Sequence, residues 1–198
     1  SPQKLANGNG KADIYENVSG TWTHRKTITA SDGAGGDNFG VSVRINDENT
    51  FAFVGADNHD SAKGAVYIFK KNHPNANDWG QYQKVISLDE RINSYFGKSI
   101  GVNGNSLLIG SPNGGNFSGA VYEVTYSTGT GKWGTQDGSN YLPSSDKIVA
   151  LDASANDQYG YSVDVYENFG VIGSKSTDMS GNVDTGSAYI VINTGEGY

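Results

Sequence analysis

Cysteine is absent from the 198-residue chain, and its absence excludes several kinds of chemistry. Without cysteine there are no disulfide bonds, no thiol nucleophile and no cysteine-ligated metal. The compartment stays open, because a secreted repeat protein can dispense with disulfides. No apolar run approaches the ~20 residues of a membrane-spanning helix. No signal peptide is visible in the polar first ten residues, so the sequence is interpreted as a mature or excised piece.

Basic residues are also scarce, and glycine takes up much of the composition. The chain has 14 Lys and Arg against 21 Asp and Glu, and its net charge is −7. A nucleic-acid backbone needs a clustered basic face and an anionic membrane attracts basic segments, so neither partner is expected. The 28 glycines and 12 tyrosines predict tight turns between half-buried β-strands. The length is that of one domain.

Three internal repeats organise the chain. Each begins at a tryptophan, passes through a short Lys-containing strand and reaches an aromatic residue followed by glycine. The tryptophans are Trp22, Trp79 and Trp133, and the aromatic–Gly pairs are Phe39-Gly40, Phe96-Gly97 and Tyr159-Gly160. From tryptophan to aromatic residue the first two repeats span 17 positions each (39 − 22 and 96 − 79), and the third spans 26 (159 − 133). The longer third span predicts a surface insertion at residues 135–143.

Two short strands follow each aromatic–Gly pair, joined by a turn of Asn, Asp and Gly residues that favour tight hairpins. A third strand comes after a polar loop, at residues 64–69, 119–124 and 186–191. With the Lys-containing strand, each repeat has four strands rich in Val, Ile, Tyr and Phe. No long segment keeps a helical period. Iterated units of four antiparallel strands predict an all-β fold of propeller blades; the alternative is a β-sandwich with accidental similarity.

The predicted propeller region is a single domain, residues 1–198. Its repeat units lie at about 17–72, 73–128 and 129–193, and an additional strand at 10–16 precedes them. That strand occupies the position of a third strand and runs into Trp22. The prediction is therefore about three blades and one extra N-terminal strand.

These motifs resemble the FG-GAP repeat, the blade unit of integrin α-subunit propellers. The aromatic–Gly pairs correspond to the FG half of the motif. The GAP half corresponds to Gly55-Ala56-Asp57, Gly110-Ser111-Pro112 and Gly173-Ser174-Lys175. The resemblance covers about residues 10–193, and three ordered copies make it specific. It implies a β-propeller in which the aromatic rings wedge between blades and the glycines permit close backbone approach.

Many FG-GAP blades carry a calcium loop of the D-x-D-x-D-G kind, and this chain lacks it. The turns at that position, residues 45–50, 102–106 and 165–169, are too short and too poor in aspartate for the 6–8 oxygen ligands that calcium takes. We therefore expect no cofactor. Four loop carboxylates are weak candidates for a cation, with solvated acids as the simpler interpretation: Asp57, Asp60, Asp178 and Asp184.

Three repeats are fewer than the roughly 4–8 blades of a closed propeller. Open blades leave strand edges and an apolar face uncovered, which natural proteins avoid. Three explanations stay open: a part of a larger propeller, a ring closed by other chains, or a compact three-blade unit. The additional strand at 10–16 is suited to complete a neighbour's blade by β-augmentation.

Motifs of catalysis and cofactor binding occur out of context. Residues 97–101 match the G-x-S-x-G nucleophile elbow, but no helix follows, so Ser99 is interpreted as a repeat-position serine. Residues 129–134 match G-x-G-x-x-G and likewise open no helix. The histidines show no metal-binding spacing. Enzyme activity is not expected. Glycosylation sequons at Asn17 and Asn116 support secretion only weakly.

The expected function is a non-enzymatic binding or scaffold module at the cell surface or in an extracellular assembly, by analogy with integrin-like proteins. A protein or glycan ligand would contact loops at one propeller face, because loops tolerate change while blades hold shape. The candidate contact residues are His59, Asn113, Phe117, Tyr141 and Asp178. Further propeller blades are the other expected partner. The alternatives are an accessory domain of a polysaccharide-active enzyme and a purely structural subunit.

Overall fold

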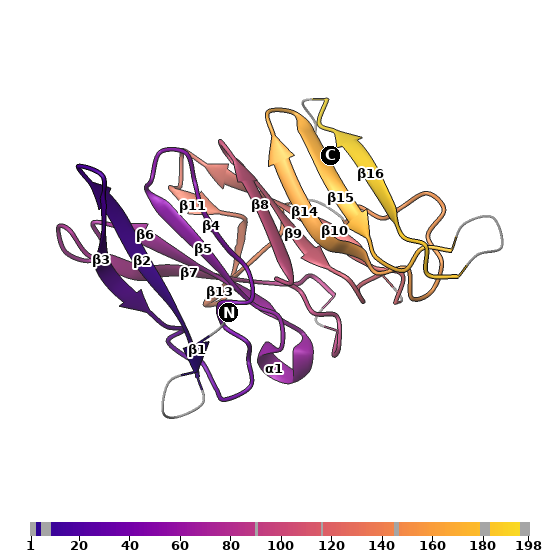
Figure 1. Ribbon diagram of the computed structural model, residues 1–198, viewed down its shortest axis with the longest axis horizontal. Helices are drawn as coiled ribbons and strands as arrows, with labels where there is room; N and C mark the ends of the chain where they lie inside the picture. The colour runs from indigo at the N-terminus through magenta and orange to yellow at the C-terminus, as the bar shows by residue number, and fades with distance from the viewer. Residues whose placement is uncertain are drawn as a thin grey trace.

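The computed structural model describes residues 3–4, 9–89, 91–115, 117–144, 147–178 and 183–194, so Asn116 lies outside the described part. The prediction of an all-β fold is confirmed: strands β1 to β16 form several antiparallel sheets, and helical structure is a four-residue turn, α1 (His59–Ala62). Figure 1 shows these sheets following one another in chain order, from the indigo β2–β3 hairpin to the yellow β16. In the described residues no helix is long and apolar enough to cross a membrane.

The N-terminal sheet has the order β1-β2-β3 and is antiparallel. Its strands are β1 (Gln3–Lys4), β2 (Gly10–Val18) and β3 (Thr21–Ile28). The strand predicted at 10–16 is β2, and it has a partner within the chain because β3 pairs with it from Ala12 to Val18. This sheet therefore contains the third strand of a blade and the tryptophan strand that follows it.

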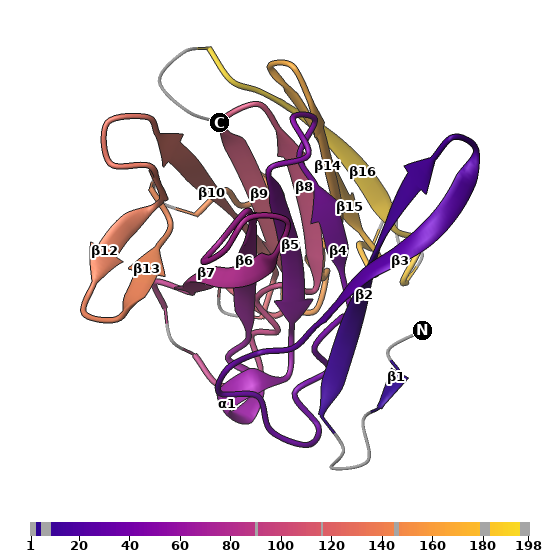
Figure 2. The same cartoon turned by 90° about the vertical axis from the view of Figure 1, so that its left-hand side faces the viewer.

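The first blade is the antiparallel series β4-β5-β6-β7. Its strands are β4 (Val43–Ile45), β5 (Phe51–Ala56), β6 (Ala65–Lys71) and β7 (Trp79–Ile86). The predicted insertion is a hairpin of β12 (Thr135–Asp137) and β13 (Asn140–Leu142), which joins the outer edge of this blade where Tyr141 pairs in parallel with Val85. Figure 2 shows this hairpin at the margin of the molecule.

The second blade and the C-terminal sheet continue the series. The second blade has the order β8-β9-β10-β11, with strands β8 (Ser99–Asn103), β9 (Ser106–Ser111), β10 (Ala120–Ser127) and β11 (Lys132–Trp133). A bridge between Val121 and Ile148 adds a further edge contact. The C-terminal sheet has the order β14-β15-β16, with strands β14 (Tyr159–Tyr166), β15 (Phe169–Ser174) and β16 (Ser187–Ile192).

The sequence repeat and the sheet are offset by one strand. Each repeat starts at a tryptophan strand, but that strand pairs with the third strand of the repeat before it: β7 pairs with β6, and β3 pairs with β2. The three tryptophans occupy the same register, opposite Asn17, Lys71 and Tyr126. Successive repeats are therefore joined by strand pairing within a sheet, in addition to side-chain packing between sheets.

Three apolar clusters lie between successive sheets. The cluster between the N-terminal sheet and the first blade contains Phe39, the next contains Phe96, and the one before the C-terminal sheet contains Tyr159. All three rings are nearly inaccessible to solvent. Each makes an edge-to-face contact with a tyrosine: the ring centroids are 5.6 Å apart for Phe39 and Tyr67, 5.4 Å for Phe96 and Tyr122, and 5.2 Å for Tyr159 and Tyr189. The repeated aromatic residue is thus an inter-sheet packing residue.

Candidate functional site

The serine of the repeated motif joins one blade to the next. Ser42 Oγ donates a hydrogen bond to the Gly97 carbonyl at 2.7 Å, and Ser99 Oγ donates to the Gly160 carbonyl at 2.9 Å. A glycine in the following strand makes this approach possible. A β-carbon on Gly55 would lie 2.1 Å from the Gly97 carbonyl oxygen. The motif therefore specifies a hydrogen bond from a serine side chain to the backbone of the next sheet, with a glycine that permits the close approach. We call this contact the clasp, and it gives Ser99 an architectural role.

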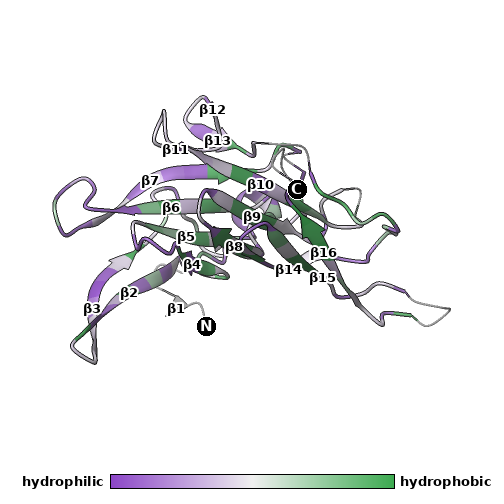
Figure 3. Ribbon diagram, turned by 90° about the horizontal axis from the view of Figure 1, so that it is seen from above, coloured by the Kyte–Doolittle hydropathy of each residue, from purple (hydrophilic) through white to green (hydrophobic). Residues whose placement is uncertain are grey.

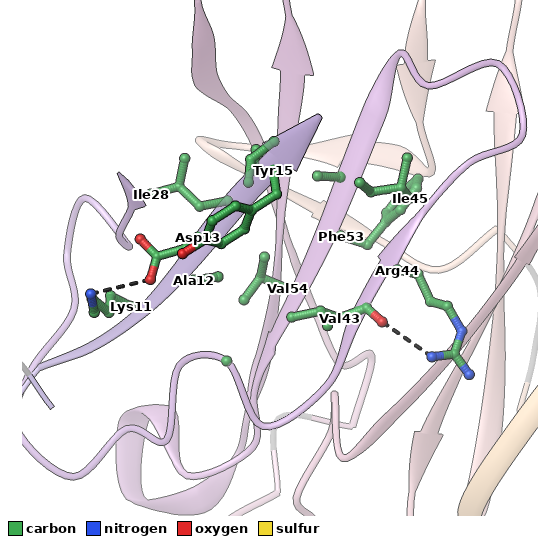
Figure 4. A pocket seen from close by; sticks show the side chains of 13 residues that line it. Lys11, Ala12, Asp13, Tyr15, Ile28, Val43, Arg44, Ile45, Phe53 and Val54 are labelled. Atoms are coloured by element: carbon green, nitrogen blue, oxygen red, sulfur yellow. Dashed lines mark hydrogen bonds and ion pairs between the residues drawn. The ribbon is translucent and has the colours of Figure 1, made fainter. Parts of the chain in front are cut away.

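A groove opens between the N-terminal sheet and the first blade. Its volume is about 620 Å³, within the range of ligand sites. Figure 4 shows β2 on one side of the groove and β4 on the other, with Val54 of β5 between them. Val43 and Ile45 are half exposed there. Their counterparts in the second blade, Ile100 and Val102, are packed into the core between blades. The groove is therefore an inter-blade space whose apolar floor is uncovered.

The wall of the groove is an open strand edge. β3 covers one edge of β2, while β1 covers the other only at Gly10 and Lys11. From Ala12 onward that second edge has no strand partner in the described part of the chain. In the complete blades this position is filled by the GAP strand: β5 lies beside β6, and β9 lies beside β10. The groove therefore lies where a GAP strand lies in the complete blades. Along the β2 side of the groove the backbone donors and acceptors are unpaired.

Two charged side chains of β2, Lys11 and Asp13, line the rim of the groove, and polar side chains of β3 contact Asp13. Lys11 Nζ lies 3.1 Å from Asp13 Oδ2, the Thr27 hydroxyl donates to Asp13 Oδ1 at 2.5 Å, and His24 Nε2 is 3.2 Å from the same oxygen. The hydrogen bond from Thr27 has the largest influence, and it holds the pKa of the Asp13 carboxyl below its usual value. The rim therefore carries a stable negative charge beside Lys11, while the floor is aliphatic.

His59, one of the predicted contact residues, belongs to a paired polar cluster. Its Nδ1 lies 2.7 Å from Asp37 Oδ2 and its Nε2 lies 2.8 Å from Lys84 Nζ. Because the ammonium donates, Nε2 accepts and Nδ1 carries the proton. Lys84 also binds Asp32 at 2.8 Å, and the Tyr67 hydroxyl donates to Asp32 at 2.7 Å. Burial raises the pKa of Asp32, but the hydrogen bonds from Lys84 and Tyr67 outweigh it and lower the pKa. These contacts hold the loop that carries Asp32 and Asp37 against the first blade.

Two candidate cation ligands near His59 already have basic partners. Asp57 is buried, accepts from Asn38 Nδ2 at 3.0 Å and pairs with Lys98 at 3.1 Å. Asp60 is exposed and pairs with Lys63 at 2.9 Å. A cation at either carboxylate would have to displace an ammonium group.

The other two candidate ligands, Asp178 and Asp184, are joined by a hydrogen bond from a backbone amide to a carboxylate. The Asp184 amide donates to Asp178 Oδ1 at 2.7 Å, and both side chains are exposed. Across the described ranges, no three His, Asp or Glu side chains gather as a metal site would require. The expectation of no cofactor stays a prediction.

The remaining predicted contact residues are dispersed. Asn113 and Phe117 lie in the loop between β9 and β10, where the exposed Phe117 ring stacks under the Arg91 guanidinium at 5.3 Å. Tyr141 is not in a loop: it lies in β13, is buried, and packs in the cluster between the two blades. The nine-residue excess predicted the insertion correctly, but it gave no sign that the inserted hairpin turns this ring inward.

Sequence reasoning did not identify the groove. Its floor residues, Val43 and Ile45, alternate as any half-buried strand does, so their exposure has no local signal. One signal was available. β2 matches the third strand of a repeat, but the described residues of its sheet include neither the FG strand nor the GAP strand of a blade, so two strand positions are unfilled apart from the short β1.

Comparison with known proteins gives the family. A family model of the FG-GAP repeat matches residues 22–69 and 144–191. Each match runs from the tryptophan or Lys-containing strand through the third strand, so it has the phase of the sequence repeat. Residues 79–124 carry the same strands in the same order. A search of curated proteins finds no match. The recurring clasp, the buried aromatic rings and the two matched ranges agree: the chain belongs to the FG-GAP repeat family.

Proposed function

We propose that the chain is a non-enzymatic scaffold module that binds an extended segment of a partner protein in the groove between β2 and β4. FG-GAP repeats suit a propeller-type binding or scaffold module. The observation that supports this particular site is the open edge of β2 above an uncovered aliphatic floor. Strand addition uses such an edge: main-chain hydrogen bonds supply affinity, and pockets for alternate side chains supply specificity.

The complete blades provide a template for the partner segment. In the first blade, Phe53 pairs with Ile68 and Gly55 pairs with Val66. Phe53 packs in the cluster that also contains Ile100. By the same register in the groove, an apolar side chain opposite Ile14 faces the exposed aliphatic floor.

The glycine in the template has a matching place in the groove. Gly55 approaches the carbonyl of Gly97, and Gly110 approaches the carbonyl of Gly160. Gly40 is the corresponding residue of the first blade, and it lines the groove. A residue with a β-carbon would collide there. The partner segment is therefore an extended strand with an apolar residue and, two positions later, a glycine.

A fluorescein-labelled peptide with the sequence of residues 105–112 is the test probe, because it carries this pattern at Leu108 and Gly110. We expect a saturable rise in fluorescence anisotropy on titration with the protein. Ile45→Asp places an unpaired charge on the groove floor and should abolish the rise. Ile190→Asp, the same substitution at a more exposed isoleucine of the C-terminal sheet, is the control and should leave binding unchanged.

Binding that is undiminished in the Ile45→Asp protein would remove the groove from the proposal, and so would a peptide with Leu108→Asp that binds as well as the parent. No saturable signal at any soluble concentration would contradict strand addition altogether. An extracellular or cell-surface location stays a prediction, as does a glycan ligand.

A further inference from the structure

The outward face of the C-terminal sheet is apolar and exposed. Phe169, Val171, Ile190 and Ile192 are 46%, 49%, 71% and 51% exposed. Figure 3 shows β16 as hydrophobic where the outer strand β3 at the other end is largely hydrophilic. Monomeric proteins rarely leave so continuous an apolar face uncovered.

The same positions are buried wherever another sheet follows. Phe169 corresponds to Phe51 of the first blade, and Val171 corresponds to Phe53, since each pair occupies the same place in its GAP strand. Phe51 and Phe53 are buried in the cluster shared with the second blade. The exposed face of the C-terminal sheet is therefore an inter-blade surface that lacks its neighbour.

The clasp is also incomplete on this face. Ser162 stands where Ser42 and Ser99 stand, but among the described residues no further sheet presents a carbonyl to it. A β-carbon on Gly173 would meet atoms of Ser162 in its own sheet, whereas one on Gly110 would meet the backbone of the next sheet at 2.0 Å. Packing and hydrogen bonding thus agree that this face has no partner in the described part of the chain.

A tryptophan covers this position inside the chain. The Trp133 ring is perpendicular to those of Phe51 and Phe53, with centroids 5.9 Å and 5.0 Å apart. Trp22 occupies the same register on β3 as Trp133 does on β11, yet Trp22 is 69% exposed. One end of the molecule therefore presents the tryptophan, and the other end presents the aromatic and aliphatic surface that receives it.

We propose that two copies of the chain associate head to tail, with Trp22 of one copy packed against Phe169 and Val171 of the other. The contact takes the place of the Trp133 contact between the first and second blades. Phe169 and Val171 of the receiving face lie outside the groove, whereas Trp22 lines a neighbouring hollow that it shares with Ile45. Because the two surfaces differ, the contact is heterologous, and successive copies add on until a ring closes or the series stays open.

Sedimentation velocity over a concentration series tests this association. We expect the average mass of the unmodified protein to rise with concentration. Trp22→Ser removes the inserted ring, and Ile190→Asp charges the receiving face. Each variant should sediment as a monomer. An equimolar mixture should form a one-to-one dimer and nothing larger, because Ile190→Asp still offers Trp22 and Trp22→Ser still offers the receiving face.

Val43→Asp is the matched control, since Val43 lines the groove but not the hollow that Trp22 lines, and this variant should associate like the unmodified protein. An unmodified protein that stays monomeric at the highest soluble concentration overturns the proposal. So does a mixture of the two variants that forms no dimer, or an Ile190→Asp protein that associates normally. None of these results bears on peptide binding in the groove, which is measured separately with the labelled peptide.

Discussion

The repeated serine makes its contact only where another sheet follows. Ser99 Oγ donates to the Gly160 carbonyl of the C-terminal sheet at 2.9 Å, and Ser42 does the same toward Gly97. Ser162 has the same sequence context, but the part of the chain that the structure describes places no sheet after it. Ser99 and Ser162 therefore hold the same position in the repeat but differ in their contacts. Comparing them separates the effect of the repeat position from the effect of the hydrogen bond.

We expect Ser99→Ala to lower the free energy of unfolding by about 1 kcal/mol, the usual contribution of one hydrogen bond, with a further cost for leaving a buried carbonyl unpaired. Ser162→Ala should change it by less than about 0.5 kcal/mol, as surface substitutions generally do. Urea denaturation followed by tryptophan fluorescence measures both. Equal losses for the two variants would show that the serine acts within its own sheet and that the clasp contributes nothing.

At the scale of the element, the glycine of the GAP strand sets how closely two blades approach. A β-carbon on Gly110 would lie 2.0 Å from the Gly160 carbonyl oxygen, which is backbone of the next sheet. At Gly173 the nearest atom is Ser162 Oγ at 2.3 Å, the end of a side chain that can rotate. Both glycines have backbone angles open to other residues, so space alone distinguishes them.

Gly110→Ala should therefore separate the second blade from the C-terminal sheet and cost roughly 3 kcal/mol, at the upper end of overpacking effects. Gly173→Ala should cost no more than about 1 kcal/mol. Thermal unfolding followed by circular dichroism compares them. If both substitutions are equally mild, the blades are more loosely packed than the clasp geometry indicates.

Much of the element structure could be predicted because turns and strand alternation are local signals. The four-strand repeat, the position of the insertion and the family all follow from them. Pairing between repeats is not local, and this is why the sheet is offset from the repeat: Trp79 opens the second repeat but pairs with Lys71 of the first. Tyr141 shows the same limit, since only the docking of β13 beside Val85 buries it.

The candidate site was harder to predict than the fold for a related reason. His59 is a loop histidine by sequence, and its pairing with Asp37 and Lys84 depends on residues 22 and 25 positions away. The groove at Val43 and Ile45 exists because two strand positions beside β2 are largely unfilled. The local sequence around His59 does not indicate its partners, and the local sequence of the groove residues does not indicate the unfilled strand positions.

At the scale of the whole molecule, the sheets form a series in which each contacts its neighbours. The first and second blades have another sheet on both sides, so their central strands take part in clusters on both faces. In the described structure the C-terminal sheet packs against the second blade on one face, and its other face is exposed at Val171 and Ile190. In repeat architectures stability is a sum of such nearest-neighbour contacts, so opening should begin at the ends of the series.

Hydrogen exchange of β10 and β16 makes this a measurable prediction, since both are third strands of the repeat. We expect the amides of β10, between buried faces, to exchange far more slowly than those of β16, whose Ile190 and Ile192 face solvent. Mass spectrometry of proteolytic peptides, at a concentration where the protein is monomeric, compares the two strands. Equal protection would mean that the whole series opens as one cooperative unit. Protection of β16 that rises with protein concentration, and does not rise in Ile190→Asp, is the further result expected if a second copy covers this face.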